Sequence, residues 1–432
     1  MTSAPNPRRR LSGNKFLLAA LSVVLLSCNA FRMVPEGNAE VPDKPPIDIV
    51  ESKDTQTKVE TEPIKIPKPD QKHELVEFFG ETYLVAGHKK EFKIALILPF
   101  YHNNSGDLVK RTSSIMLDYY TGVLMALNSL QAKGINLKLY VYDNQNDSNE
   151  LKSILKKREL TSMDFIVGPI VETNMAIVSE FALKHDIGVI SPFSSIGKLE
   201  TENPRFYATA PNPRMKARQL IDFLSSEHAG KKLIILRDGQ PYEKQFVPIL
   251  LEELKLRNTV KYVEQEYNSG LNWNSLMSSS DTTIIYLPTQ QSIIVSSTLG
   301  YIYSTKRDAM IIGEHSWADF EDNDYSFWTK LNVHLLATDF IDYQSNEVNE
   351  FRRLYRQENI TDPSLYAYLG YDQFHFLGDF LMAFGEHYAT YLNDKDFRYL
   401  SSSFKFTRTD GFNQNTKLFI LRFKDMKLEL AE

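Results

Sequence analysis

The hydrophobic pattern divides the chain into three parts. Residues 16–26 form one short apolar run, and residues 28–90 hold seven prolines among alternating acids and lysines, without an apolar period before Leu75. From Phe92 onward, short apolar runs alternate with stretches in which apolar residues recur every three or four positions. These two patterns are typical of buried strands and amphipathic helices. We therefore expect a leader (1–27), a disordered Pro-rich tether (28–90) and a folded body (91–432).

The body alternates strands with helices in two blocks. The first block predicts strands at 92–98, 137–142, 165–167 and 188–191, separated by helices at 113–133, 150–158 and 174–185. The second predicts helices at 216–227, 242–256, 272–279 and 291–304, with strands at 232–236, 260–267, 282–287 and 310–313. Residues 332–342 are interpreted as a strand crossing back. Strict alternation favours parallel sheets covered by helices on both faces, so we predict an α/β fold with two doubly wound lobes.

Composition and charge narrow the function classes. The chain of 432 residues is 42% hydrophobic and 24% charged, which is ordinary for a globular protein. Its net charge is −6, and it becomes −10 after Cys28, because Arg8, Arg9, Arg10 and Lys15 are the only charged residues before that position. An acidic body without a basic block argues against nucleic-acid binding. The one cysteine forms no internal disulfide and no Cys-based zinc site.

The N-terminus has the pattern of a secretory signal peptide, in which a basic segment precedes a short apolar run. The string LLSC at 25–28 resembles the bacterial lipobox, which implies lipid attachment at Cys28 and a membrane anchor. The alternative is an ordinary signal peptide in which Cys28 is incidental. Asn29 stands where enteric lipoproteins retained in the inner membrane carry Asp, so this analogy favours the outer membrane, with the body in the periplasm.

Motifs spread over the body resemble those of the type I periplasmic binding proteins, the leucine-binding-protein-like family. They are IALILPF (94–100), YYTGVLMA (119–126), YD (142–143), FIVGP (165–169), ISPFSS (190–195), FYATAP (206–211) and AYLGYD (367–372). The resemblance implies two lobes joined by three crossover strands, with ligand held in the cleft between them. The first lobe would span about 92–210 and 340–405, and the second about 211–339 and 406–432.

A second family shares this fold and several of these strings. The penicillin-binding-protein activator lipoproteins, which regulate peptidoglycan synthesis, match residues 96–100, 142–143 and 167–169 about equally well. This resemblance implies an interaction module that docks a cell-wall synthase, without a known solute.

Catalytic and metal motifs are absent from the sequence. No hydrolase, zinc-peptidase or phosphate-loop string occurs, and no two histidines are three or four residues apart. We therefore predict no catalytic residue, metal or cofactor, and a protein that is not an enzyme.

The family resemblance implies a set of ligand-binding residues. Loop hydroxyls of the first lobe would hold a ligand carboxylate, and an acid of the second lobe would hold an ammonium. The matching positions are Glu172, Thr173, Ser194, Ser195, Tyr242 and Glu314. Simpler roles are open for three of them: Ser194 would cap its loop, Glu172 would cap a helix and Tyr242 would pack at a helix start.

The function predicted from these residues is capture of a small polar solute, such as an amino acid or a peptide. The protein partner would be an ABC permease, or a cell-wall synthase if the alternative reading holds.

Overall fold

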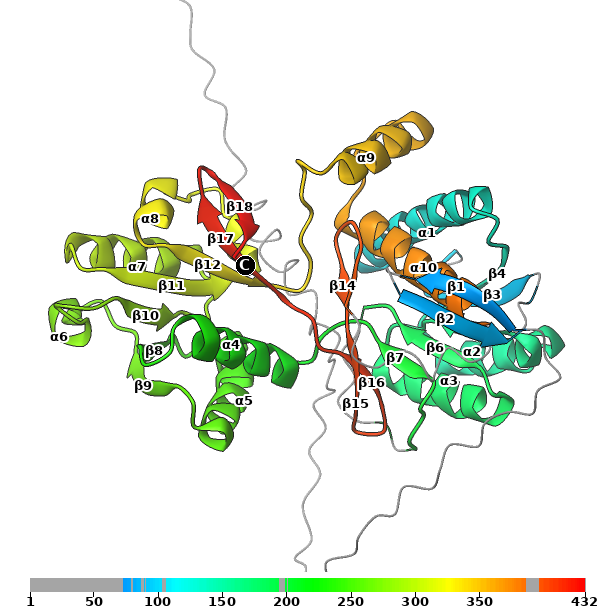
Figure 1. The fold of residues 1–432 in the computed structure, drawn as a ribbon, viewed down its shortest axis with the longest axis horizontal. Helices are drawn as coiled ribbons and strands as arrows, with labels where there is room; N and C mark the ends of the chain where they lie inside the picture. Colours follow the sequence, from blue (N-terminus) through cyan, green and yellow to red (C-terminus); the bar gives the residue numbers. More distant parts are fainter. Residues whose placement is uncertain are drawn as a thin grey trace, which may run out of the picture.

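The computed structural model describes residues 73–78, 81–86, 89, 91–102, 106–193, 199, 201–385 and 396–431. These residues form two α/β lobes, each built on a seven-stranded sheet (Figure 1). This arrangement confirms the predicted fold class. Among the helices described, none has the length and apolar character needed to cross a membrane.

The first-lobe sheet has the strand order β15-β16-β7-β6-β5-β3-β4 and is parallel except for β15. Its strands are β3 (Phe92–Leu98), β4 (Leu137–Asp143), β5 (Phe165–Val167), β6 (Gly188–Ser191), β7 (Phe206–Ala208), β15 (Phe406–Thr409) and β16 (Phe412–Asn415). Its helices are α1 (Asp107–Ala132), α2 (Ser148–Leu155), η1 (Arg158–Ser162), α3 (Glu172–His185), α9 (Asn346–Asn359) and α10 (Leu365–Phe384). A short ladder, β13 (Phe397–Arg398) with β14 (Ser403–Phe404), follows α10 in the chain.

The central strand β3 shows why this sheet is covered on both faces. Successive side chains of a strand point to opposite faces. Ile94, Leu96 and Leu98 join the core under α1 and α10, whereas Ala95 and Ile97 join the core under α2 and α3. An unbroken apolar run is therefore the pattern that a strand between two helical layers requires.

The second-lobe sheet has the order β18-β17-β12-β11-β10-β8-β9, with β17 and β18 antiparallel to their neighbours. Its strands are β8 (Lys232–Arg237), β9 (Lys261–Glu266), β10 (Thr283–Tyr286), β11 (Ala309–Glu314), β12 (Val333–Ala337), β17 (Phe419–Lys424) and β18 (Lys427–Leu430). Its helices are α4 (Pro213–Glu227), α5 (Pro241–Arg257), α6 (Trp273–Leu276), α7 (Ser292–Ser304), η2 (His315–Asp319) and α8 (Tyr325–Lys330). One core lies under α4 and α5, and the other contains Trp273, Trp317 and Trp328.

The chain crosses between the lobes three times, at residues 209–212, 338–345 and 416–418. Two of these positions differ from the sequence prediction. The segment taken as a crossing strand is β12, a strand of the second sheet, and the crossing follows it. Residues 406–415, which were assigned to the second lobe, form β15 and β16 of the first sheet, because their amide side chains bond to backbone carbonyls beside β7.

A hairpin occupies the end of the predicted tether. Strands β1 (His73–Phe78) and β2 (Glu81–Ala86) pair antiparallel and contact α10. Figure 1 shows them beside this helix on the first lobe. Leu75 pairs with Leu84 and Val76 with Tyr83 in the register of this antiparallel ladder. The range predicted as the tether (28–90) therefore includes a paired hairpin near its end. The remainder of the predicted tether lies outside the described residues.

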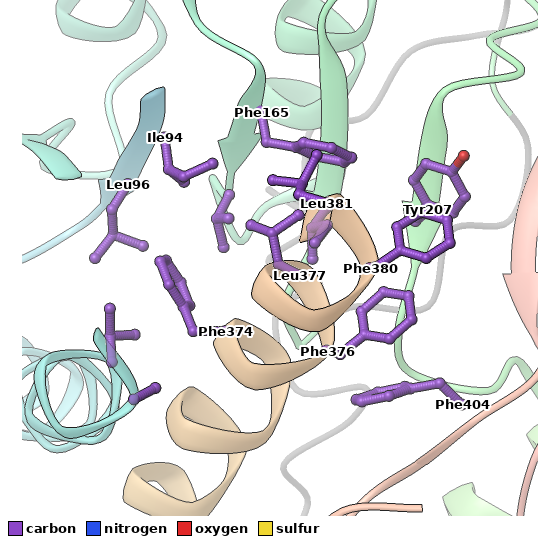
Figure 2. Packing of buried hydrophobic residues seen from close by; sticks show 14 of the residues in the cluster. Ile94, Leu96, Phe165, Tyr207, Phe374, Phe376, Leu377, Phe380, Leu381 and Phe404 are labelled. Carbon is purple, nitrogen blue, oxygen red and sulfur yellow. The ribbon is translucent and has the colours of Figure 1, made fainter. Parts of the chain in front are cut away.

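Helix α10 is the centre of the first-lobe core. Figure 2 shows Phe374, Leu377 and Leu381 turned toward Ile94, Leu96 and Phe165 of the sheet. The Phe376 ring lies 5.1 Å from that of Phe404 and 5.4 Å from that of Phe380. These contacts fix the C-terminal half of α10 in the first-lobe core.

Helices α1 and α10 approach each other through glycine. A Cβ at Gly122 would lie 1.9 Å from the carbonyl oxygen of Ala367, and a Cβ at Gly370 would lie 2.1 Å from that of Tyr119. Since both obstacles are backbone atoms, any side chain at either position forces the helices apart. The strings YYTGVLMA and AYLGYD thus form the two sides of one helix–helix contact.

A buried carboxylate joins α10 to the loop between β13 and β14. Asp372 is fully buried and accepts hydrogen bonds from the backbone N–H groups of Leu400 (3.0 Å), Ser401 (2.7 Å) and Ser402 (2.9 Å). The Ser401 hydroxyl donates a fourth bond at 2.6 Å. The YD string of α10 therefore positions a loop that borders the interlobe cleft.

Candidate functional site: the interlobe cleft

A cleft of 2250 Å³ is lined by residues of both lobes and of the 338–345 crossing. The second lobe contributes side chains from α4, α5, η2, α8 and the β17–β18 hairpin. The first lobe contributes one side of α1, α9 and α10 and the loop that Asp372 holds. This cleft lies between the two lobes and combines apolar walls with several polar side chains, and we take it as the candidate site.

Four side chains form a closed polar group on the second-lobe side of the cleft, here called the Glu314 cluster: Lys216, Tyr242, Tyr286 and Glu314. Tyr286 and Glu314 end the neighbouring parallel strands β10 and β11, whose carboxyl ends lie at one edge of the sheet. Tyr242 lies in the first turn of α5, which begins just after β8, and Lys216 lies near the start of α4. The fold thus brings together residues from four separate elements.

The carboxylate of Glu314 is the acceptor for all three other side chains of the Glu314 cluster. The hydroxyls of Tyr242 and Tyr286 donate to Glu314 at 2.8 Å and 2.7 Å, on different carboxylate oxygens. The Lys216 ammonium forms an ion pair with Glu314 and bonds to the Tyr242 hydroxyl. Glu314 is 5% exposed and Tyr286 is fully buried, so the charges are held largely out of water. Burial and the neighbouring carboxylate raise the pKa of Tyr286 well above its ordinary value, so its hydroxyl keeps its proton.

Two aromatic rings complete the surroundings of Lys216. Its ammonium nitrogen lies 5.1 Å from the centroid of the Tyr242 ring and 4.9 Å from that of Phe246. The two rings are stacked, with 6.2 Å between their centroids. A cation within about 6 Å of an aromatic ring is attracted by its quadrupole. Lys216 is therefore held by one anion, one hydroxyl and two rings.

The first-lobe side of the cleft carries a polar stripe on α10. Tyr371, His375 and Asp379 follow at four-residue spacing, which places them on one helix face, and all three line the cleft. His375 is 4% exposed, and its Nε2 has no hydrogen-bond partner among the described residues. Burial lowers the pKa of His375 to about 3, so its imidazole is neutral at physiological pH. Burial also raises the pKa of Asp379.

The structure separates the sequence-predicted residues into three groups. Tyr242 and Glu314 are hydrogen-bonded to each other in the cleft. Glu172 and Thr173 are exposed in the first turn of α3 and do not line this cleft. Ser194, Ser195 and Cys28 lie outside the described residues. The ligand-binding role of the first six residues and the lipid attachment at Cys28 remain predictions.

Sequence reasoning missed Lys216, Tyr286 and His375. The sequence pattern places Lys216 on the polar face of a predicted helix and Tyr286 inside a predicted strand, and neither position indicates a site. The signal for His375 is its place between Tyr371 and Asp379 at helical spacing, inside an otherwise apolar helix. Across the described part of the chain, no group of three or more His, Cys, Asp or Glu side chains is placed to hold a metal ion.

Comparison with known proteins gives structural matches only. No protein-family model and no curated protein matched the sequence. A putative branched-chain amino acid ABC transporter from Rhodospirillum rubrum matches with a TM-score of 0.58 and 13% identity, over 79% of this chain and 100% of that one. The C-domain of LpoA from Haemophilus influenzae, a regulator of PBP1A, matches with a TM-score of 0.55 and 13% identity, over 79% and 100%.

A third match has the same character. A periplasmic ligand-binding protein of a branched-chain amino acid ABC transporter from Burkholderia xenovorans gives a TM-score of 0.52 and 11% identity, over 79% of this chain and 94% of that one. At such identities the similarity establishes the fold of the two lobes.

Proposed function

We propose that this chain, whose fold is that of the type I periplasmic binding proteins, binds a polar ligand between its lobes without chemically changing it. The observation that carries the proposal is the cleft of 2250 Å³, which both lobes and a crossing segment line. Small-molecule sites usually measure about 300–1,000 Å³. The larger size favours a short peptide or a solute of similar size over a free amino acid. The two lobes have separate hydrophobic cores and are joined by three crossing segments. This arrangement is compatible with closure of the lobes by a hinge motion.

Thermal-shift and calorimetric titration with amino acids, short peptides and their amides tests this proposal. We expect a peptide to raise the melting temperature, because a ligand that binds only the folded state stabilises it by mass action. At 100 times the dissociation constant the gain is about 2.7 kcal/mol. The control is the variant Ser129→Trp, which places a bulky side chain in the cleft. The same panel should raise the melting temperature of this variant less than that of the wild type. A panel that leaves the melting temperature unchanged contradicts the proposal.

A second candidate function is regulation of peptidoglycan synthesis by docking a cell-wall synthase. The similarity to the LpoA C-domain over its whole length supports it, since that domain belongs to a regulator of PBP1A. The Glu314 cluster also supports it, because a cleft side whose charges already satisfy each other needs no solute. Titration of the purified protein with envelope synthases distinguishes the two functions, since only this one predicts a saturable protein complex without solute.

We further propose that the mature protein is lipid-anchored at Cys28 in the cell envelope. The support is the LLSC string after a basic and apolar leader. Substitution Cys28→Ser is expected to move the protein from the detergent phase to the aqueous phase in a phase-partition assay, because the acyl chains are its only proposed anchor. Labelled fatty acid should be incorporated into the wild-type protein and not into the variant. Labelling of both would place the lipid elsewhere.

A further inference from the structure

The environment of Lys216 is that of a bound ammonium ligand. Organic cations are recognised by a buried carboxylate together with aromatic faces. Here Glu314, Tyr242 and Phe246 supply both, and the cation between them is a side chain of the protein itself. Lys216 lines the cleft, and its side chain is 15% exposed, so this cage opens toward the ligand space.

We propose that Lys216 is the internal occupant of an ammonium cage, and that it determines specificity by excluding ligand amines and offering an N–H group to a ligand oxygen. This inference rests on the proposed ligand-binding function, and it names the chemistry of one end of the ligand. That end carries an acceptor oxygen, as in a carboxylate or an amide carbonyl.

Charge and hydrogen-bond capacity explain the exclusion. The carboxylate of Glu314 already accepts from two tyrosine hydroxyls and from Lys216. A second ammonium would share one anion with a like charge, which is unfavourable in a site shielded from water. Lys216 is also covalently attached beside its partner, so its effective concentration, typically millimolar or higher, exceeds that of a free amine.

The number of N–H donors on Lys216 explains why the site would prefer a ligand oxygen. A lysine ammonium has three N–H donors. Two of them are directed to the Glu314 carboxylate and the Tyr242 hydroxyl. Among the described residues the third N–H has no acceptor, so it is available to a ligand acceptor in the cleft, where a charge-assisted hydrogen bond is stronger than a neutral one.

Chemical rescue tests the cage directly and needs no natural ligand. In Lys216→Ala, loss of the cation leaves Glu314 buried and uncompensated, so the melting temperature should fall by roughly 5 °C. Butylammonium chloride should restore at least half of this loss by occupying the vacated space, whereas sodium chloride at equal concentration should not. The wild-type protein should show no response specific to butylammonium. Absence of rescue in a folded variant would overturn the proposal.

Two matched variants separate the cage from general salt effects. The double variant Lys216→Ala/Glu314→Gln lacks the anion, so butylammonium should leave its melting temperature unchanged. Lys216→Arg refills the cage with a guanidinium and should also be unresponsive. Rescue of the double variant would show binding elsewhere and would refute the cage.

Lys216→Met covers the case in which the alanine variant does not fold. Methionine keeps most of the apolar stem over Phe246 and removes the charge, so ammonium chloride should stabilise this variant more than sodium chloride does. An equal response to both salts would contradict the proposal. If the cage is confirmed while every peptide in the ligand screen fails, the proposed function falls and the cage stands. If a peptide binds while butylammonium fails to rescue Lys216→Ala, the proposed function stands and the cage is refuted.

Discussion

Substitution Gly122→Ala is expected to lower the free energy of unfolding by at least about 3 kcal/mol. The new Cβ would lie 1.9 Å from the carbonyl oxygen of Ala367, and neither backbone can yield without moving α1 or α10. Separation of these helices would loosen the packing of α10 on the sheet that Figure 2 shows. Urea unfolding followed by far-ultraviolet circular dichroism measures the loss.

Gly300→Ala is the matched control, because Gly300 also lies inside a helix. A Cβ there would meet only a side-chain atom of Phe327, at 3.7 Å. Since alanine is the better helix former, this variant should be as stable as the wild type or gain up to about 1 kcal/mol. Equal midpoints for the two variants would show that α1 and α10 tolerate a wider spacing than their glycines indicate.

Substitution Asp372→Ala is expected to have a comparable effect for a different reason. It leaves the three N–H groups of residues 400–402 without their acceptor, and each buried unsatisfied group costs about 1–3 kcal/mol. We expect a total loss of at least about 3 kcal/mol in urea unfolding. Ser345→Ala, which removes a half-buried helix cap from α9, should cost only about 1 kcal/mol. An equally small loss at Asp372 would mean that water replaces its carboxylate.

Asp372 also gives the stability of the protein a specific pH dependence. Burial, opposed by the hydrogen bonds from the loop, raises the pKa of Asp372 to about 6. The native state therefore binds this proton more tightly than the unfolded state does, and the contribution of Asp372 to the free energy of unfolding decreases as the pH rises from about 4 to about 6. The Asp372 contribution to this decrease is roughly 3 kcal/mol. Comparison with Asp372→Asn isolates it, since other carboxylates titrate equally in both proteins. Parallel pH profiles would contradict the raised pKa.

The alternation of strands and helices could be predicted because each buried strand is a short apolar run that ends at a turn residue. The misplaced crossing shows where this signal fails. Asn413, Gln414 and Asn415 are buried, yet their pattern is polar, because their amides donate to the carbonyls of Pro204, Ala210 and Thr209. These hydrogen bonds join the ring contact between Phe412 and Phe206 in holding β16 beside β7. The sequence pattern detects only apolar burial.

The candidate site was predictable only in part for a related reason. Tyr242 and Glu314 follow strands at the expected edge of the sheet, so a resemblance between sequences locates them. Lys216 lies 26 residues before Tyr242 and 98 before Glu314, on a helix whose exposed side is polar. Only the tertiary arrangement shows that its charge turns inward. Because Lys216 already pairs with Glu314, this carboxylate is not free to bind a ligand ammonium. The sequence around Glu314 alone does not show this pairing.

The β1–β2 hairpin determines which lobe would bear a force applied to the N-terminal segment of the chain. It attaches everything N-terminal of His73 to the first lobe, beside α10. The chain connects the second lobe to the first through three crossings, and Arg398 of β13 also lies 4.3 Å from the ring centroid of Phe419 in β17. A force applied through the chain before His73 would therefore act first on the first lobe, and would reach the second lobe only after passing through that lobe.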